Sequence, residues 1–303
     1  MKRLIMKKWK NFEDRFFTGL IIAVLVFICF SMFYPFWNAV VIAFNESRDT
    51  TAGGLTFWPR KFTLENVSYV LQDPRIGNAF FISVLRTGIG TFVAVLINAL
   101  FAFSLSRPEL KLRKVYLALS IFALYFSGGM IPTYILIRDI GLRNNFWVYI
   151  FPGALSVWNM IIFRSFFASL PAGLIESARI DGAGWYLIFF RIIIPISLPV
   201  FATLSLFTAV GHWNSWFDAA LYISRQELSP IQTILNTILN SNSMQELMSK
   251  LPGPAATALS HLVISSRTVS MTTMVVATMP ILLVYPFIQR YFVHGVMIGS
   301  LKG

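Results

Sequence analysis

Charge is scarce in this 303-residue chain, since Asp, Glu, Lys and Arg make up 13% of it, about half the share that is usual for a soluble domain. Apolar residues make up 56%, and the mean hydropathy is +0.67. This composition excludes an ordinary water-soluble globule and favours a polytopic membrane protein. Cysteine is also nearly absent. With Cys29 alone, no intrachain disulfide can form, and the redox compartment cannot be read from the sequence.

The sequence also lacks the patterns of most catalytic sites. It has no G-x-x-x-x-G-K-[ST] phosphate loop, so we expect no ATP site of that type. His212, His261 and His294 are scattered without metal-ligand spacing, and no nucleophile elbow occurs. We therefore expect no catalytic residue, cofactor or metal in this chain. The net charge of +12 lacks the basic stripe with interleaved aromatic residues that nucleic-acid binding requires, so nucleic acid is not an expected partner.

Long apolar runs are what the chain does contain. A helix needs about 20 apolar residues to cross a bilayer core of about 30 Å, and lipid leaves no partner for unpaired backbone groups. The sequence therefore predicts an all-α fold. The bulky residues after the first run do not fit a signal-peptide cleavage site, so this run should stay as a span. After a tail at 1–15, we expect one transmembrane domain at 16–303, with six spans at about 16–44, 78–106, 115–137, 147–170, 196–222 and 271–292.

Basic residues predict the orientation of these spans. They are dense in the N-terminal tail and at 107–114, but sparse in the longer loops of the opposite side. Because cytoplasmic loops collect Lys and Arg, both termini and the segment 171–195 should be cytoplasmic, and the loops 45–77 and 223–270 external. The second external loop contains an apolar helical face, which would pack on its own bundle or, as the less favoured alternative, on a partner: Ile231, Ile234, Leu235 and Ile238.

The segment 171–195 contains the polar interruption "ESARIDGAGWYLIFFRIIIP". It reads as two short helices, the second over 185–194, joined by a reversal that Gly182 and Gly184 permit. Glu176 and Arg179 are spaced i,i+3 and could pair. Pro195 would mark the entry to the fifth span. Composition alone favours the alternative of an ordinary interfacial loop.

This stretch resembles the EAA loop of permease subunits of binding-protein-dependent ABC importers. The residues at matching spacings are Glu176, Ala178, Gly182, Ile192 and Pro195, whereas Ser177 replaces an alanine and Ile194 a leucine. The run Asp-Gly-Ala at 181–183 is typical of the carbohydrate-uptake branch. The tail "YPFIQRYFVHGVMIGSLKG" is similar to that of the maltose-type second permease and its polysaccharide-importer relatives. The resemblance covers essentially the whole chain.

The resemblance implies a type I ABC importer permease that moves an oligosaccharide or polysaccharide fragment, with acidic fragments among the candidates, across a bacterial cell membrane. Its implied partners are a second homologous permease, two ATP-binding subunits that hold ATP and Mg, and an extracytoplasmic binding protein. The hairpin would couple to the ATPase through Glu176, Ser177, Ala178, Arg179, Asp181, Gly182, Ala183, Gly184 and Pro195. In the tail, Gln289, Arg290 and Lys302 would either touch the ATPase or snorkel to the interface.

Asp218 is the single acidic residue within the predicted spans, and Arg86 is a basic residue in the second of them. Asp218 belongs to "GHWNSWFDAALY", in which Asn214 lies four residues earlier, with Trp213 and Trp216 on neighbouring faces. Aromatic faces and amides or acids are what a sugar path offers, so these five residues are solute-path candidates. The open alternatives are an interfacial aromatic belt, polar stitching between helices and, for Arg86, snorkelling.

Three other readings compete with a carbohydrate importer subunit. The nearest is a permease of the same fold for another solute class. A self-sufficient carrier should show repeated halves or buried proton relays, and neither is visible. An intramembrane enzyme would need a converging acid and base constellation, which is also missing.

Overall fold

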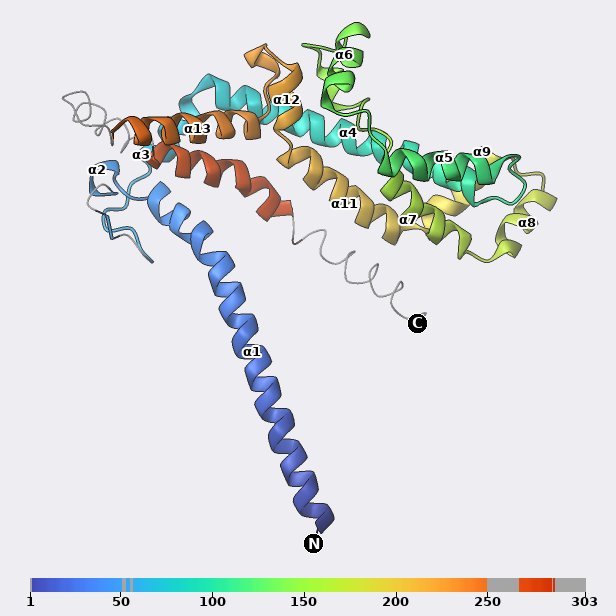
Figure 1. Ribbon diagram of the computed structural model, residues 1–303, viewed down its shortest axis with the longest axis horizontal. Coiled ribbons are helices and arrows are strands. Elements are labelled where there is room, and N and C mark those ends of the chain that lie inside the picture. Colours follow the sequence, from blue (N-terminus) through green and yellow to red (C-terminus); the bar gives the residue numbers. More distant parts are fainter. Residues whose placement is uncertain (1, 51–52, 55–56, 250–266, 285, 287–303) are drawn as a thin grey trace. The chain divides into compact units, whose positions relative to one another are not determined.

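The structure is a computed structural model, which describes residues 2–50, 53–54, 57–249, 267–284 and 286. The regular elements of these residues are all helical, apart from one isolated bridge between Asn45 and Phe62, and this confirms the all-α prediction. The elements are α1 Lys2–Ala43, α2 Ser47–Thr50, α3 Glu65–Gln72, α4 Pro74–Ser106, α5 Arg113–Tyr125, α6 Met130–Asp139, η1 Phe146–Tyr149, α7 Val157–Ala168, α8 Ala172–Ile180, α9 Trp185–Ile188, η2 Phe189–Ile193, α10 Ile194–Ile196, α11 Leu198–Asn214, α12 Phe217–Tyr222, η3 Gln226–Leu228, α13 Ile231–Ser249 and a last helix, Arg267–Val284 (Figure 1).

Three helices of the described chain are long and apolar enough to cross a membrane alone: Asp14–Ala43 of α1, α4, and Arg267–Val284. Three further candidates are bent pairs, so the count rises to six if each pair is one span. The bends are 113° between α5 and α6, 76° between α7 and α8, and 84° between Trp185–Ile196 and α11.

Three predicted spans are interrupted. The span at 115–137 breaks at 126–129, where Gly129 has a φ of +87° that a residue with a Cβ rarely adopts. The span at 147–170 begins with the short 3₁₀ helix η1 and a non-helical stretch, so its α-helix starts only at Val157. The span at 196–222 breaks between α11 and α12, at residues 215–216. Part of the predicted span at 271–292 lies outside the described residues. The single domain over 16–303 stays a prediction.

The chain divides into two compact units, of which the first comprises Met1–Gln72 and Ile238–Val276. Asn45, fully buried, organises the turn that follows α1. Its Nδ2 donates to Asp49 Oδ2 and Thr50 Oγ1, both at 3.0 Å, and its Oδ1 accepts from the Lys61 amide at 2.9 Å. Two hydrogen bonds lower the pKa of Asp49 because they stabilise its ionised carboxylate, and the bond from Asn45 has a larger effect than the bond from Arg60. In α1, the apolar side chains from Phe16 to Phe27 are exposed, as a helix surrounded by hydrocarbon requires.

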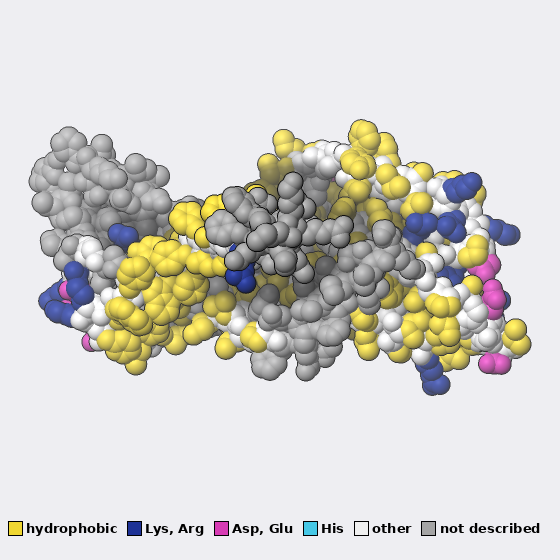
Figure 2. Space-filling model, turned by 90° about the horizontal axis from the view of Figure 1, so that it is seen from below, with side chains coloured by type: hydrophobic (Ala, Val, Ile, Leu, Met, Phe, Trp, Pro, Cys, Tyr) yellow, Lys and Arg dark blue, Asp and Glu magenta, His cyan; other side chains and the backbone are white. Residues whose placement is uncertain are grey.

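The second unit comprises Asp73–Thr237 and Ala277–Gly303. Within it, α4 packs against both α7 and α11, and the three helices run side by side in Figure 1. Their core is rich in aromatic residues, including Phe103, Phe163, Phe167 and Phe189. At the end of this unit that carries α8 and the turn at 107–114, Lys and Arg side chains gather beside a few Asp and Glu side chains, with hydrophobic side chains around them (Figure 2).

One buried amide holds the non-helical stretch before α7 against α4. Asn98 is fully buried, its Nδ2 donates to the Ala94 and Ala154 carbonyls at 2.7 and 2.8 Å, and its Oδ1 accepts from the Ser156 amide at 2.9 Å. Irregular backbone is tolerated at membrane depth only where protein or a wet cavity meets its polar groups. Asn98 meets two of them, and it thereby fixes one wall of the cavity described below.

The apolar face predicted in the loop 223–270 is present at the start of α13. Ile231 is fully buried and Leu235 is 8% exposed, while the Ile231 amide donates to Ser83 Oγ of α4 at 2.9 Å. This end of α13 therefore packs on its own bundle, which was the favoured alternative.

Candidate functional site

The turn of the hairpin is a helix-capping motif at the end of α8. The amide of Gly182 donates to the Arg179 carbonyl at 3.1 Å, and that of Ala183 donates to the Ala178 carbonyl at 2.9 Å. These two bonds form a Schellman motif, which requires a left-handed conformation at the residue that donates the first bond. Gly182 supplies it with a φ of +79°. The predicted reversal at Gly182 is confirmed, and Gly184 takes an extended conformation as the N-cap of α9.

The side chains of the hairpin divide into an anchor and a free surface. Ile175 is buried in the core of the second unit, and Ala178 and Ala183 pack against that core. These two alanines therefore contribute to the fit of the hairpin on its own helices. The exposed side of the first helix and turn presents Glu176, Ser177, Arg179, Ile180 and Asp181.

The predicted pairing of Glu176 with Arg179 is wrong. The guanidinium of Arg179 lies 4.5 Å from the ring centroid of Trp185 on the second helix, and no ion pair joins it to Glu176 in the described chain. A cation over an indole face is a favourable contact. Arg179 therefore fastens the two helices together and leaves the Glu176 carboxylate free of that partner.

The second half of the hairpin is not a plain α-helix over 185–194. Residues Phe189–Ile193 form the π-helical turn η2, in which the Ile194 amide donates to the Phe189 carbonyl. Pro195 has no amide hydrogen and its ring crowds the carbonyl four residues earlier, so a widened turn ahead of it relieves that crowding. Pro195 itself is exposed, and the 84° bend into α11 occurs at the fully buried Ser197.

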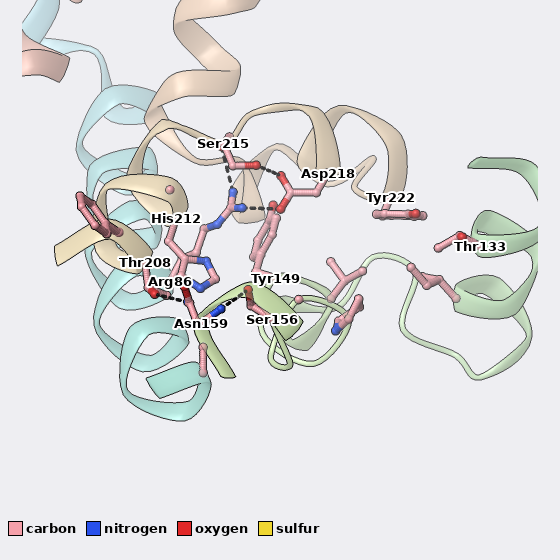
Figure 3. A pocket seen from close by; sticks show the side chains of 17 residues that line it. Arg86, Thr133, Tyr149, Ser156, Asn159, Thr208, His212, Ser215, Asp218 and Tyr222 are labelled. Atoms are coloured by element: carbon pink, nitrogen blue, oxygen red, sulfur yellow. Dashed lines mark hydrogen bonds and ion pairs between the residues drawn. The ribbon is translucent and has the colours of Figure 1, made fainter. Parts of the chain in front are cut away.

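A cavity of about 500 Å³ lies among α4, α6, α7, α11 and α12. Its labelled polar side chains converge from several helices in Figure 3. The lining residues are Arg86, Ala94, Thr133, Ile137, Val148, Tyr149, Pro152, Gly153, Ser156, Asn159, Phe207, Thr208, Gly211, His212, Ser215, Asp218 and Tyr222. Hydroxyls, an amide, aromatic rings and one pair of opposite charges are thus brought to one space.

Arg86 and Asp218 form an ion pair at this cavity (Figure 3). Arg86 is 2% exposed, and its Nη1 donates to the Ser215 carbonyl at 3.0 Å. Its guanidinium also lies 4.5 Å from the ring centroid of Tyr149. Asp218 Oδ1 accepts from the Ala219 amide at 2.9 Å and from Ser215 Oγ at 3.1 Å. Arg86 therefore does not snorkel, because its charge is turned inward to a carboxylate.

The uncharged part of the wall is suited to sugar hydroxyls. Asn159 Nδ2 donates to Thr208 Oγ1 at 3.2 Å, so α7 and α11 present an amide and a hydroxyl side by side. Phe207 is 53% exposed and offers an aromatic face. Apolar faces with a few polar groups are what carbohydrate recognition uses.

The structure separates the five solute-path candidates. Arg86 and Asp218 line the cavity, whereas Trp213, Asn214 and Trp216 do not. Trp213 is buried, its Nε1 donates to the Ala277 carbonyl at 3.1 Å, and its ring packs edge-on against Phe80. Asn214 and Trp216 are exposed. The prediction that Asn214 and Asp218 share one face of a helix is wrong, because the helix breaks between them.

Sequence reasoning missed most of the cavity wall. Polar residues within apolar spans tend to face the interior of a bundle, so four of the lining residues could have been predicted from the sequence: Thr133, Ser156, Asn159 and Thr208. Tyr149 and His212 carried no such signal, because nothing in the sequence says that they line the same cavity as Arg86. The predicted tail contacts Gln289, Arg290 and Lys302 lie outside the described residues.

Comparison with known proteins gives the family. The chain is 37% identical over 296 residues to the polygalacturonan/rhamnogalacturonan transport system permease protein YtcP of Bacillus subtilis (strain 168), which covers 96% of this chain and 100% of that protein. This chain belongs to the permease proteins of carbohydrate ABC transport systems. The permease is also 36% identical to protein LplC of the same organism, over 89% of both chains. No protein-family model matches it.

A solved structure agrees with this assignment. The permease matches a chain in the crystal structure of a bacterial ABC transporter involved in the import of the acidic polysaccharide alginate, with a TM-score of 0.82 and 26% identity over 92% of this chain and 98% of that one. The resemblance stated from the hairpin and tail is confirmed, as is the importer-permease fold. The permease is a membrane-embedded transport subunit that works with an ATPase and a binding protein.

Proposed function

We propose that this permease imports uronate-containing oligosaccharides, the fragments of an acidic polysaccharide such as polygalacturonan. The observation that carries the proposal is the 37% identity over almost the full length to a polygalacturonan/rhamnogalacturonan permease. The likeness to an importer of alginate, another acidic polysaccharide, supports it. The cavity supports it too, because its volume of about 500 Å³ falls in the usual range of ligand pockets, about 300–1,000 Å³.

The proposed assembly contains one copy of this chain, a second homologous permease, two ATPase subunits and an extracytoplasmic binding protein. ATP and Mg would be held by the ATPase subunits, and this chain would have no ATPase site of its own. The exposed first helix of the hairpin would dock on an ATPase subunit. The end that carries α8 would face the cytoplasm of a bacterium, with both termini on that side, since exposed Lys111 and Lys114 gather there as on cytoplasmic loops.

Transport by the reconstituted complex tests the solute class. We expect proteoliposomes that contain ATP and receive loaded binding protein to accumulate labelled trigalacturonate. One relative at 28% identity is named a melibiose/raffinose/stachyose import permease, so raffinose is the matched neutral trisaccharide. Accumulation of raffinose without trigalacturonate would contradict the acidic class and favour a neutral oligosaccharide instead.

A further inference from the structure

We propose that Arg86 is the residue that selects acidic sugars in this permease, and that the Asp218 carboxylate pairs with Arg86 when no substrate is bound. A uronate carboxylate entering the cavity displaces the Asp218 carboxylate from the Arg86 guanidinium, and Asp218 returns when the sugar leaves. The exchange swaps one ion pair for another and breaks no covalent bond. This inference rests on the proposed function, because it concerns how the same cavity recognises the same class of solute.

The fixed member of the pair is Arg86. Its side chain is 2% exposed on α4, with a carbonyl and an aromatic face in contact with the guanidinium. Its Nε is buried without a hydrogen-bond partner among the described residues, so the guanidinium still has a donor to offer. A buried cation without a counter-ion is strongly destabilising. A carboxylate, from the protein or from a ligand, therefore stabilises the buried charge of Arg86.

The exchangeable member is Asp218. Its side chain is 27% exposed, far more than that of Arg86, and it lines the cavity. It sits at the start of α12, a six-residue helix that begins just after the break at 215–216. When Asp218 gives up the guanidinium, its Oδ1 keeps the Ser215 hydroxyl and the Ala219 amide as donors. Its charge then faces the cavity, so Asp218 does not become an unpaired charge in the core.

This arrangement makes acidic sugars bind weakly enough to be released. A uronate gains a planar, two-donor contact with Arg86, which matches carboxylate geometry, but must first displace an equivalent carboxylate. The net gain is the difference between two similar pairs, so the sugar can leave again. A neutral sugar has no group that replaces Asp218. It therefore meets only the hydroxyls and the amide, such as Thr208 and Asn159.

The simpler alternative is that the pair only fastens α12 to α4. Ligand charge separates the two ideas, because trigalacturonate and its trimethyl ester have the same ring hydroxyls and differ in charge. We would titrate both ligands by calorimetry into the complete, nucleotide-free complex in nanodiscs without the binding protein. We expect the wild type to bind the acid about threefold more tightly than the ester, because the gain is only the difference between two similar ion pairs.

The variants make the inference specific. Arg86→Gln should remove the preference for the acid and leave the affinity for the ester unchanged. Asp218→Asn removes the competitor and should tighten the acid several-fold, with no change for the ester. Arg75→Gln is the matched control, because Arg75 pairs with Asp73 at the start of the same helix, is exposed and does not line the cavity. If Arg86→Gln does not assemble, Arg86→Lys keeps the charge and should keep part of the preference.

Each outcome decides one point. An acid preference that survives Arg86→Gln overturns the role of Arg86 and leaves the proposed solute class standing. Equal weakening of acid and ester by Arg86→Gln and Asp218→Asn also overturns it, since that pattern belongs to a purely structural pair. A wild-type complex that binds the two ligands equally, or neither, overturns the inference, whereas the proposed solute class is decided separately by the uptake of trigalacturonate.

Discussion

At the scale of single residues, two helices of the second unit pack closely at a glycine, which has no side chain. Gly90 of α4 lies against the imidazole of His212 on α11, and a Cβ at this position would lie 2.7 Å from two ring atoms. Close helix contact therefore depends on glycine here for space, not for backbone freedom. The same contact places His212 in the cavity wall.

Gly90→Ala should weaken the packing of α4 on α11. Overpacking of a filled site costs about 1–3 kcal/mol, so we expect a lower unfolding temperature of the purified permease in detergent, measured by intrinsic fluorescence. Gly88→Ala is the control, because a Cβ there meets nothing within 4 Å. Adding His212→Ala should restore part of the stability lost in Gly90→Ala. Equal unfolding temperatures for the two glycine variants would show that the contact is not tight.

At the scale of elements, the hairpin depends on how α8 ends. The Schellman motif places Gly182 in a left-handed conformation, while a Cβ on Gly182 would meet nothing within 4 Å. Its requirement for glycine is thus conformational and not one of space. Ile175, Ala178 and Ala183 then hold the hairpin on the core, so its angle is fixed by packing as well as by the turn.

Gly182→Val should disrupt the turn and abolish transport by the assembled complex, with membrane insertion intact. A β-branched residue at positive φ costs about 1–2 kcal/mol or more, and the hairpin would reshape to avoid it. Gly173→Ala, within α8, is the matched control and should transport normally, since alanine suits a helix and finds open space there. Uptake of labelled sugar and membrane fractionation measure the two effects. Normal uptake by Gly182→Val would refute the role given to the turn.

At the scale of the whole molecule, the hairpin and the cavity share the same two helices. α7 runs from Ser156 and Asn159 in the cavity wall toward α8, and α11 runs from the bend at Ser197 back to Thr208 and His212 in that wall. A displacement of the hairpin would therefore act on both sides of the cavity. We infer that this continuity is how an ATPase subunit would open and close the path.

Charge reversal on the hairpin tests this continuity. Glu176→Lys should leave the chain inserted and the basal ATPase activity of the complex detectable, but remove the stimulation by loaded binding protein, because an exposed contact charge is inverted. Asp14→Lys is the control, since Asp14 is also an exposed acid and belongs to α1, not to the hairpin. Stimulated ATP hydrolysis in proteoliposomes is the measurement. Wild-type stimulation in Glu176→Lys would remove Glu176 from the proposed contact.

The sequence by itself determined the class of the molecule and the place of its hairpin. Apolar runs of span length permit little besides helices in lipid, and the reversal at Gly182 is a local matter of one residue and its neighbours. Because the hairpin is a local sequence feature, its resemblance at 176–195 was enough to name the family.

Only the tertiary structure decided the cavity. Arg86 and Asp218 are 132 residues apart, and the partners of Arg179, Asn98 and Trp213 follow from how helices pack and where they break. Helix breaks such as that at 215–216 are set by distant contacts rather than by local preference, so the face on which a residue lies could not be read by counting along the chain. Burial then favours the pairing of a charge with an opposite charge, which a linear pattern does not encode.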